Sequence, residues 1–513
     1  MTTEIELKLR IPRSWVRRLL GHPLFRQARQ RARVRLYSIY FDTPSGLLQR
    51  QGLALRLRRG ATGWEQTLKG KGGAAAGLHR RREWTAVLPG PRLDWGAWDA
   101  AELPRCLSRP KIRDRLVQLF ASDFLRVSGV VDTPAGAKVE WALDRGRLVA
   151  GSSTESLCEL ELELLEGPVA GIYELALVLH DHFPLRLENR SKAERGYALL
   201  DGGTPHPVKA AASPLIPCMD AATGFQAILA DTLGQLLANE PGTRLGEEPE
   251  YLHQMRVAVR RLRSALNLFG AGLPPAAIGP VIEAVRGLGR DLGAARDWDV
   301  FVLGSLAGAR AAFADHPGIA VLAAACEEHR RLANQQVREL LESPDYGRLL
   351  LRLSAWMAVQ PWRQGGDELG RPLDEFAAVV LERCQRRVRK RGRNLAGLTA
   401  EERHRLRIAV KKLRYAADFM APLYPPRQVA AYLRSLSRLQ DVFGALNDHA
   451  TAMRLLENVA LELPGAEQQQ ALGLVWGWIA RAAQQELERL PKAWNEFAGI
   501  RPFWRRRALE KER

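Results

Sequence analysis

Hydrophobic and polar residues alternate in several segments of the first 200 residues. A period of two residues places one set of side chains on each face of a β-strand. Turn-forming residues separate these segments, and two stretches with helical spacing, 14–20 and 173–183, interrupt them. The alternating segments include Glu4–Leu9, Leu53–Arg58, Val139–Leu143 and Glu159–Leu164. The N-terminal part is therefore predicted to consist mainly of strands.

The pattern changes after a segment rich in glycine and proline that ends at Pro217. Beyond it, segments rich in Ala, Leu and Arg carry apolar residues at i, i+3, i+4 and i+7, which is typical of amphipathic helices. Thr399–Glu402 fits a capping box at the start of one helix. We expect an α+β multidomain protein with a first domain over 1–203, a linker over 204–217 and an all-helical domain over 218–513.

The helical half repeats itself. The spacing of basic residues that begins at His253 recurs at His404, with an offset of 151 residues. A second motif, Leu-x4-Gly-Ala-x2-Asp, begins at Leu288 and recurs at Leu439 with the same offset of 151. Two independent matches at one offset predict two similar helical units of about 150 residues each.

The charge of the chain indicates an anionic partner. Its formal net charge is +19, which fits nucleic acid, an anionic membrane or a phosphorylated molecule, and charge alone does not choose among them. The five cysteines are scattered and form no CxxC pair, which argues against a disulfide framework or a zinc site. Without a signal peptide or an apolar run of about 18 residues, the expectation is a cytoplasmic protein that does not associate with membranes.

Glutamates that share one face of a strand are the first residues that indicate a binding site. Residues two apart share a face of a strand, so Glu4 and Glu6 point one way with Lys8, as do Glu159, Glu161 and Glu163. A solvated outer face of an ordinary sheet would also explain any one of these strands. Across the set, however, repulsion between neighbouring carboxylates favours bound Mg²⁺ or Mn²⁺. Arginines on other strands, such as Arg56 and Arg58, would suit phosphate oxygens.

These residues resemble the CYTH family, the triphosphate tunnel metalloenzymes. The resemblance covers residues 1–200 and includes the Glu4–Lys8 ExExK string and further motifs in the family's order. These are Tyr40–Pro44, Leu55–Arg58, Lys69, Gly77–Glu83, Phe124–Arg126, Glu140–Asp144, Glu159–Glu163 and Ser191–Tyr197. The resemblance implies an eight-stranded antiparallel β tunnel barrel that hydrolyses or cyclises a triphosphate with a divalent metal, Mg²⁺ or Mn²⁺.

The same resemblance implies the roles of individual residues. The metal ligands would be Glu4, Glu6, Glu161 and Glu163, with Glu159 as an addition. The catalytic or phosphate-binding residues would be Lys8, Arg56, Arg58, Lys69, Arg81, Glu83, Arg126 and Lys192. One departure is Thr85, where the family often has a third charged residue after Arg81 and Glu83. It leaves a second metal and the choice of substrate open.

The basic residues of the helical half also share helix faces. The repeated residues are His253, Arg256, Arg260 and Arg263, and His404, Arg407, Lys411 and Arg414. A solvated basic face is the alternative, and zinc binding is disfavoured by the neighbouring arginines. Like charges at this spacing destabilise an isolated helix, and a bound polyanion would remove that cost.

This half resembles the CHAD family, on the basic motif together with Leu292–Asp297 and Leu446–Asp448. The resemblance spans about residues 218–510 and implies two four-helix units that bind inorganic polyphosphate. The whole arrangement is similar to bacterial inorganic triphosphatases with an appended CHAD domain.

The leading hypothesis is a hydrolase acting on inorganic triphosphate, with polyphosphate bound by the basic helices. Alternatives are an adenylate cyclase, a thiamine or nucleoside triphosphatase on the same tunnel, or a non-catalytic polyphosphate-binding protein. Nucleic acid is disfavoured because the basic helices lack interleaved aromatic residues and no groove-reading motif occurs. The sequence indicates no oligomeric state.

Overall fold

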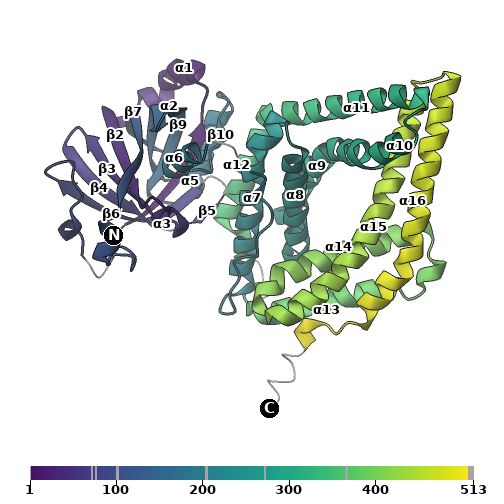
Figure 1. The fold of residues 1–513 in the computed structure, drawn as a ribbon. Coiled ribbons are helices and arrows are strands. Elements are labelled where there is room, and N and C mark those ends of the chain that lie inside the picture. The colour runs from purple at the N-terminus through teal and green to yellow at the C-terminus, as the bar shows by residue number, and fades with distance from the viewer. Residues whose placement is uncertain are drawn as a thin grey trace, which may run out of the picture. The chain divides into compact units, whose positions relative to one another are not determined.

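The computed structural model describes residues 2–70, 73–75, 78–99, 103–202, 206–270, 273–363 and 368–505, apart from the side chains of 2–3, 73–75 and 79–81. The chain divides into two compact units. The first contains Met1–His206 and Glu342–Val359, and the second contains Pro207–Leu341 and Gln360–Arg513 (Figure 1). Each unit is described by itself.

An antiparallel sheet forms the first unit. Its strands follow the order β10-β1-β9-β8-β7-β2-β3-β4-β6-β5, and β1 also pairs with β6. The eight strands from β1 to β6 in that order therefore form an unbroken circuit of pairings, and the predicted fold class is confirmed. The strands are β1 (Thr2–Arg10), β2 (Arg29–Asp42), β3 (Ala54–Gly60), β4 (Gly63–Lys69), β5 (Gly73–Ala75), β6 (Leu78–Leu88), β7 (Val117–Asp132), β8 (Lys138–Ala150), β9 (Ser153–Glu166) and β10 (Arg186–Leu187).

The alternation seen in the sequence separates two environments. Leu7 and Leu9 of β1 and Leu160 and Leu162 of β9 are fully buried in an apolar cluster. That cluster includes residues of α1 (Val16–Gly21), α2 (Pro23–Arg26) and α5 (Ala170–His180). The intervening charged residues of these strands take the opposite face. The other short helices of this region are α3 (Leu47–Arg50), α4 (Pro110–Arg113) and α6 (Lys192–Leu200).

A helix from the middle of the chain completes the first unit. The helix α12 (Pro344–Val359) packs against α5, and its Leu351 is 1% exposed within the apolar cluster. His180 Nε2 lies 2.8 Å from the Pro344 carbonyl oxygen, and Arg348 pairs with Asp181 at 2.6 Å. A Cβ atom on Gly347 would lie 2.6 Å from the His180 ring, so the helix approaches as closely as a glycine allows. The sequence pattern contains no sign of this docking.

In the part of the second unit that the structure describes, the long elements are all helices. Its long helices are α7 (Ala221–Leu245), α8 (Pro249–Phe269), α9 (Pro275–Val300), α11 (Pro317–Glu342), α13 (Leu373–Arg391), α14 (Ala400–Met420), α15 (Pro426–Ala460) and α16 (Ala466–Gly499), with a short α10 (Ala307–Ala312). The predicted capping box is confirmed, because Thr399 accepts from the Glu402 amide and Glu402 accepts from the Thr399 amide.

The sequence repeat is visible in the helices. His253 lies on α8 and His404 on α14, and both helices contain 21 residues. The second motif lies on α9 and α15 in the same way. The two repeats meet where α8 packs against α14 and α9 packs against α15. Among the described helices, none combines the length and apolar character that a bilayer span requires.

Candidate active site

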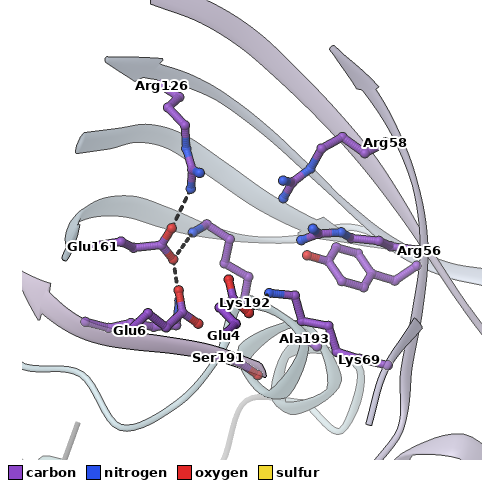
Figure 2. A pocket seen from close by; sticks show the side chains of 13 residues that line it. Glu4, Glu6, Arg56, Arg58, Lys69, Arg126, Glu161, Ser191, Lys192 and Ala193 are labelled. Atoms are coloured by element: carbon purple, nitrogen blue, oxygen red, sulfur yellow. Dashed lines mark hydrogen bonds and ion pairs between the residues drawn. The ribbon is translucent and has the colours of Figure 1, made fainter. Parts of the chain in front are cut away.

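A charged cavity lies inside the ring of strands, with an open volume of about 580 Å³. Its lining residues come from β1, β2, β3, β4, β7 and β9 and from the N-terminal end of α6. They are Glu4, Glu6, Lys8, Tyr40, Ala54, Arg56, Arg58, Lys69, Arg126, Glu161, Ser191, Lys192 and Ala193. Figure 2 shows Glu6 and Glu161 on one side of the cavity and Arg56 and Arg58 on the other.

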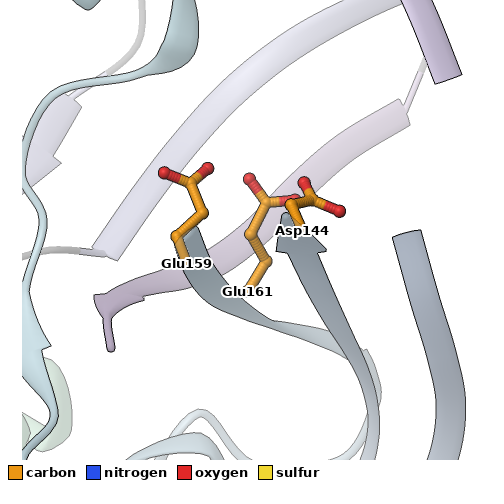
Figure 3. Close-up of side chains that lie close together, drawn as sticks. All are labelled: Asp144, Glu159 and Glu161. Carbon is orange, nitrogen blue, oxygen red and sulfur yellow. The ribbon is translucent and has the colours of Figure 1, made fainter. Parts of the chain in front are cut away.

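Three buried carboxylates form one end of the charge network. Asp144, Glu159 and Glu161 offer oxygens that all lie within 4.8 Å of one another (Figure 3). Lys192 Nζ binds all three, at 2.7 Å from Asp144, 2.5 Å from Glu159 and 2.9 Å from Glu161. Arg126 adds an ion pair to Asp144 at 2.7 Å. The oxygens of these three carboxylates are therefore already bound by the protein's own lysine and arginine side chains.

The pKa values of this group follow from its charges. Burial alone would raise the pKa of Glu161, but Lys192, Lys8 and Arg126 hold it well below its usual range. Burial raises the pKa of Glu159, although Lys192 opposes the shift. Conversely, burial would lower the pKa of Lys192, but the three carboxylates raise it. Charged forms of the lysine and Glu161 stabilise one another.

A second carboxylate group is compensated unevenly, because Lys8 pairs with Glu6 at 2.7 Å whereas Glu163 makes no ion pair among the described side chains. Glu6 on β1 lies opposite Glu163 on β9, which lies opposite Glu140 on β8. Burial and then the charges of Glu4, Glu6 and Glu140 raise the pKa of Glu163 to about 7. Burial and Glu6 also raise the pKa of Glu4, although Lys69 lies 2.6 Å away. Carboxylate oxygens without enough lysine or arginine around them are a donor set that fits Mg²⁺ or Mn²⁺.

Arg58, across the cavity, has the opposite imbalance. Arg58 donates to Ser38 Oγ at 3.1 Å and makes no carboxylate ion pair among the described residues. Burial and then Arg56 and Arg126 lower its pKa to about 10. Arg56 reaches Glu83 only at 3.7 Å, and its Nε has no hydrogen-bond partner. Both guanidinium groups are available to phosphate oxygens.

The structure brings most of the predicted residues of this region to one place. Glu4, Glu6, Lys8, Arg56, Arg58, Lys69, Arg126, Glu161 and Lys192 line the cavity. Glu83 pairs with Lys69 at 3.4 Å, and Glu159 lies behind the lining, bound by Lys192 and Arg195. Glu163 neighbours Glu6 across the strand pair. The side chain of Arg81 lies outside the described residues.

Several residues of the network were absent from the sequence-based assignment. Asp144, Arg195 and Glu140 belong to the motifs that carry the family resemblance, but spacing alone did not give them a role. Tyr40 is the only aromatic residue of the described lining. Its ring stacks on Phe120 at 4.6 Å. Although burial opposes ionisation, Arg56, Arg58 and Lys192 lower the pKa of Tyr40.

The repeated motifs of the second unit meet in what we call the inter-repeat cluster, formed by His253, Arg256 and Arg260 of α8 with Arg407 and Lys411 of α14. Burial and then Arg407 and Arg260 lower the pKa of Lys411 to about 8. The Nε atoms of Arg260 and Arg407 are buried and have no hydrogen-bond partner among the described residues. Two carboxylates compensate part of this charge: Asp297 pairs with Arg256 at 3.0 Å, and Asp448 opposes the lowering of the Arg407 and Lys411 pKa values. The cluster holds more positive than negative charge.

Three of the predicted polyphosphate residues lie elsewhere or at the margin. Arg414 pairs with Asp418 at 2.8 Å and also contacts Ser437. Arg263 is exposed, and His404 is exposed beside Arg407, with 3.5 Å between their nitrogens. Helical spacing places such residues on one broad face, but it does not distinguish the part that faces the other repeat.

Comparison with known proteins finds two family domains in the chain. A model of the CYTH domain matches residues 2–197, and a model of the CHAD domain matches residues 227–457. The chain contains a CYTH domain followed by a CHAD domain. The CHAD assignment is supported by the crystal structure of the CHAD domain from the plant Ricinus communis, with 32% identity and a TM-score of 0.52, covering 58% of this chain and 98% of that one.

The CYTH domain has a curated relative. Over 169 residues it is 30% identical to the inorganic triphosphatase of Haemophilus influenzae, a match that covers 32% of this chain and 46% of that protein. The chain thus matches less than half of the length of this relative. A Hippeastrum protein, HpAC1, described as having a dominant triphosphatase activity, is 22% identical with a TM-score of 0.27, over 40% of this chain and 98% of that one.

Proposed function

We propose that the CYTH domain hydrolyses inorganic triphosphate to pyrophosphate and phosphate with Mg²⁺ or Mn²⁺, and that the CHAD domain binds inorganic polyphosphate. One observation carries the first part of the proposal. One cavity is lined by Glu4, Glu6 and Glu161, with Glu163 opposite Glu6 across the strand pair, and also by Arg58, which has no carboxylate partner among the described residues. A metal-bound polyanion needs both kinds of group.

Glu4, Glu6 and Glu163 are the residues that would hold the metal. A bound divalent ion neutralises phosphate charge and lowers the pKa of a coordinated water. At Glu6 and Glu4 a metal would compete with Lys8 at 2.7 Å and Lys69 at 2.6 Å. The carboxylates around Lys192 are less suited, because a metal there would have to displace one lysine that binds three carboxylates. These carboxylates instead keep Lys192 charged and in place beside the substrate.

The cations would bind and orient the triphosphate. Arg56, Arg58 and Lys69 would hold its oxygens, while Arg126 lies at the border with the carboxylates. Water forms a bond to the terminal phosphorus as the bond from that phosphorus to the bridging oxygen breaks, and pyrophosphate leaves. Charge then spreads over the phosphoryl oxygens, and fixed guanidinium groups stabilise it without reorganisation.

The lining residues favour an inorganic substrate over a nucleotide. A nucleobase or a thiamine ring would need an apolar or aromatic surface. Tyr40 is the only aromatic residue of the described lining, and its ring already stacks on Phe120. A nucleoside or thiamine triphosphatase and an adenylate cyclase therefore remain alternatives with less support.

Polyphosphate binding by the CHAD domain rests on the inter-repeat cluster. The buried and unsatisfied Nε atoms of Arg260 and Arg407 need acceptors, and burial of an unsatisfied donor costs about 1–3 kcal/mol. A polyanion between the repeats would supply acceptors and remove the repulsion that lowers the Lys411 pKa. Arginine and lysine at this density are typical of phosphate-binding surfaces.

The test is phosphate release from four substrates: inorganic triphosphate, ATP, thiamine triphosphate and long-chain polyphosphate, each with Mg²⁺ and with Mn²⁺. We expect the fastest release from inorganic triphosphate. Faster release from ATP or thiamine triphosphate would assign the cavity to that substrate instead. Absence of release from all four would contradict the enzymatic part of the proposal.

A further inference from the structure

A second group of cations lies on the helices of the CHAD domain, apart from the inter-repeat cluster. We call it the α13 cluster; its members are Arg383, Arg387 and Arg391 of α13, Lys412 of α14 and Arg263 of α8. The helices α13 and α14 pack side by side (Figure 1). Positions 383, 387 and 391 are four residues apart, so they follow one face of α13 over roughly 12 Å.

Two adjacent lysines show that the clusters are separate. Burial and then Arg387, Arg263 and Arg391 lower the pKa of Lys412. Different arginines, Arg407, Arg260 and Arg256, act on Lys411. The two sets of arginines share no member, because consecutive residues point about 100° apart around a helix. Lys412 therefore belongs to a different face of α14.

Within the described part of the chain, no carboxylate neutralises the α13 cluster. None of its five residues makes an ion pair, and Arg391 donates only to the carbonyl oxygen of Arg405, at 2.8 Å. By contrast, Arg386 of the same helix pairs with Glu382 at 3.9 Å, and Glu382 also pairs with Arg505 at 2.8 Å. The four arginines of the cluster are exposed, so an external anion can reach them.

The first repeat shows that the fold can neutralise this position. Arg261 corresponds to Lys412 at the repeat offset of 151 residues. It is 5% exposed, pairs with Asp231 at 2.7 Å and donates to Gln235 at 2.7 Å. The second repeat instead places Lys412 among arginines. Converging like charges destabilise the fold unless an anion compensates them.

We propose that the α13 cluster is a second binding surface for inorganic polyphosphate, which holds the part of a long chain that extends beyond the inter-repeat cluster. This inference rests on the proposed polyphosphate binding by the CHAD domain. A polymer of phosphate alone fits better than single-stranded nucleic acid, because stacking needs exposed aromatic side chains. The one aromatic residue of α13, Phe376, is 8% exposed.

The test compares two polyphosphate lengths on the full chain, one long and one too short to reach both clusters. The variant carries Arg387→Ala with Lys412→Ala, and the matched control carries Arg454→Ala with Arg481→Ala, which removes the same charge from exposed positions. We expect the α13 variant to lose about tenfold in affinity for the long chain and to show a shallower salt dependence. Its affinity for the short chain should stay within about twofold.

Four results would overturn the inference. One is unchanged affinity of the α13 variant for the long chain, and another is an equal loss in the matched control. A third is an equal loss for both lengths. The fourth is a single-stranded oligonucleotide of similar charge that binds more tightly than polyphosphate and that the α13 variant binds less tightly than wild type does.

A second variant separates this inference from the proposed function. Arg260→Ala with Arg407→Ala should weaken binding of both lengths, because it removes the inter-repeat cluster. If that variant behaves as expected while the α13 variant binds like wild type, the inference alone fails. If wild-type protein binds neither length, both fail. Thermal melting of each variant checks folding, and removal of mutually repelling cations should leave the melting temperature unchanged or raise it.

Discussion

The lysines of the two domains show opposite electrostatic environments. In the CYTH cavity, carboxylates raise the pKa of Lys8 and Lys192 against the effect of burial. In the inter-repeat cluster, burial and neighbouring arginines lower the pKa of Lys411 to about 8. The opposite pKa shifts of these lysines show that anionic groups dominate around Lys8 and Lys192, whereas cationic groups dominate around Lys411.

Because of this difference, the two sites differ in whether they need a divalent cation to bind a polyanion. A polyanion entering the cavity meets carboxylates that repel it, so productive binding there requires a divalent cation. A polyanion entering the inter-repeat cluster meets excess positive charge and needs no metal. Both sites bind phosphate in our account, but only the cavity has the paired charges that a phosphoryl transfer uses.

Removing one carboxylate should have the largest effect. Glu6→Gln takes a ligand from the proposed metal site, and we expect triphosphate hydrolysis to fall by a factor of about 10²–10³, as for the loss of one group that stabilises a transition state. Binding of polyphosphate should not change. Glu166→Gln is the matched control, since this glutamate ends β9, the strand that pairs with β1, but its side chain is exposed. Equal activity of Glu6→Gln and wild type would remove Glu6 from the site.

Replacing a buried leucine of α12 tests whether the packing of this helix stabilises the CYTH unit. Leu351 is 1% exposed, so Leu351→Ala should lower the free energy of unfolding of this unit by about 2–5 kcal/mol. Denaturant unfolding monitored together with hydrolysis measures the effect. Val359→Ala, at the 50% exposed end of the helix, should cost far less. A loss confined to polyphosphate binding would contradict the packing seen here.

Neutralising the inter-repeat cluster should reverse the pattern of Glu6→Gln. Arg260→Ala with Arg407→Ala should lower polyphosphate affinity by at least about 100-fold, because hydrogen bonds to charged groups contribute about 1.5–3 kcal/mol each and the variant removes two arginines. Hydrolysis of triphosphate should remain at the wild-type rate. Binding is measured by fluorescence anisotropy and hydrolysis by phosphate release. If the double variant hydrolyses slowly but binds normally, the assignment of the two sites is reversed.

The smallest expected effect is a pH dependence of a few fold. The pKa of Lys411 is about 8 in the folded protein against an ordinary value of 10.5, so its charge destabilises the fold fully below pH 8, and this cost disappears as pH rises towards 10.5. A bound polyanion favours the charged form, so affinity should fall between pH 7 and pH 9.

Lys411→Arg keeps its charge and should flatten this dependence, whereas Lys492→Arg, at an exposed position, should not. Burial and neighbouring arginines lower the pKa of His253 and of His404 from their ordinary value, which is away from this pH range. Binding curves recorded between pH 7 and pH 9 measure how the polyphosphate affinity of each variant depends on pH. An unchanged slope in Lys411→Arg would show that Lys411 does not contact the polyanion.

Periodicity predicted much of the fold, because alternation along β1 and β9 reflects a real division between an apolar and a charged face. The 151-residue offset likewise corresponds to helices α8 and α14 of equal length. Docking of α12 was not predictable, since it depends on the close approach that Gly347 permits beside His180. Such complementarity between distant segments leaves no periodic signal.

The candidate sites were predictable as sets of residues but not as arrangements. Spacing grouped Glu159, Glu161 and Glu163, whereas the structure separates them: Lys192 binds the first two, and the third lies between Glu6 and Glu140. That separation depends on α6, which is remote in sequence and brings Lys192 to the carboxylates. Ion pairs across distant segments are therefore the information that the sequence lacked.

The most direct test measures both activities in one preparation, with Mg²⁺ and then with an excess of chelator. Our account predicts that chelation abolishes triphosphate hydrolysis and leaves polyphosphate affinity unchanged, because only the cavity needs a metal to accept an anion. Hydrolysis that survives complete chelation, or polyphosphate binding that disappears with it, would contradict the division of roles between the two domains.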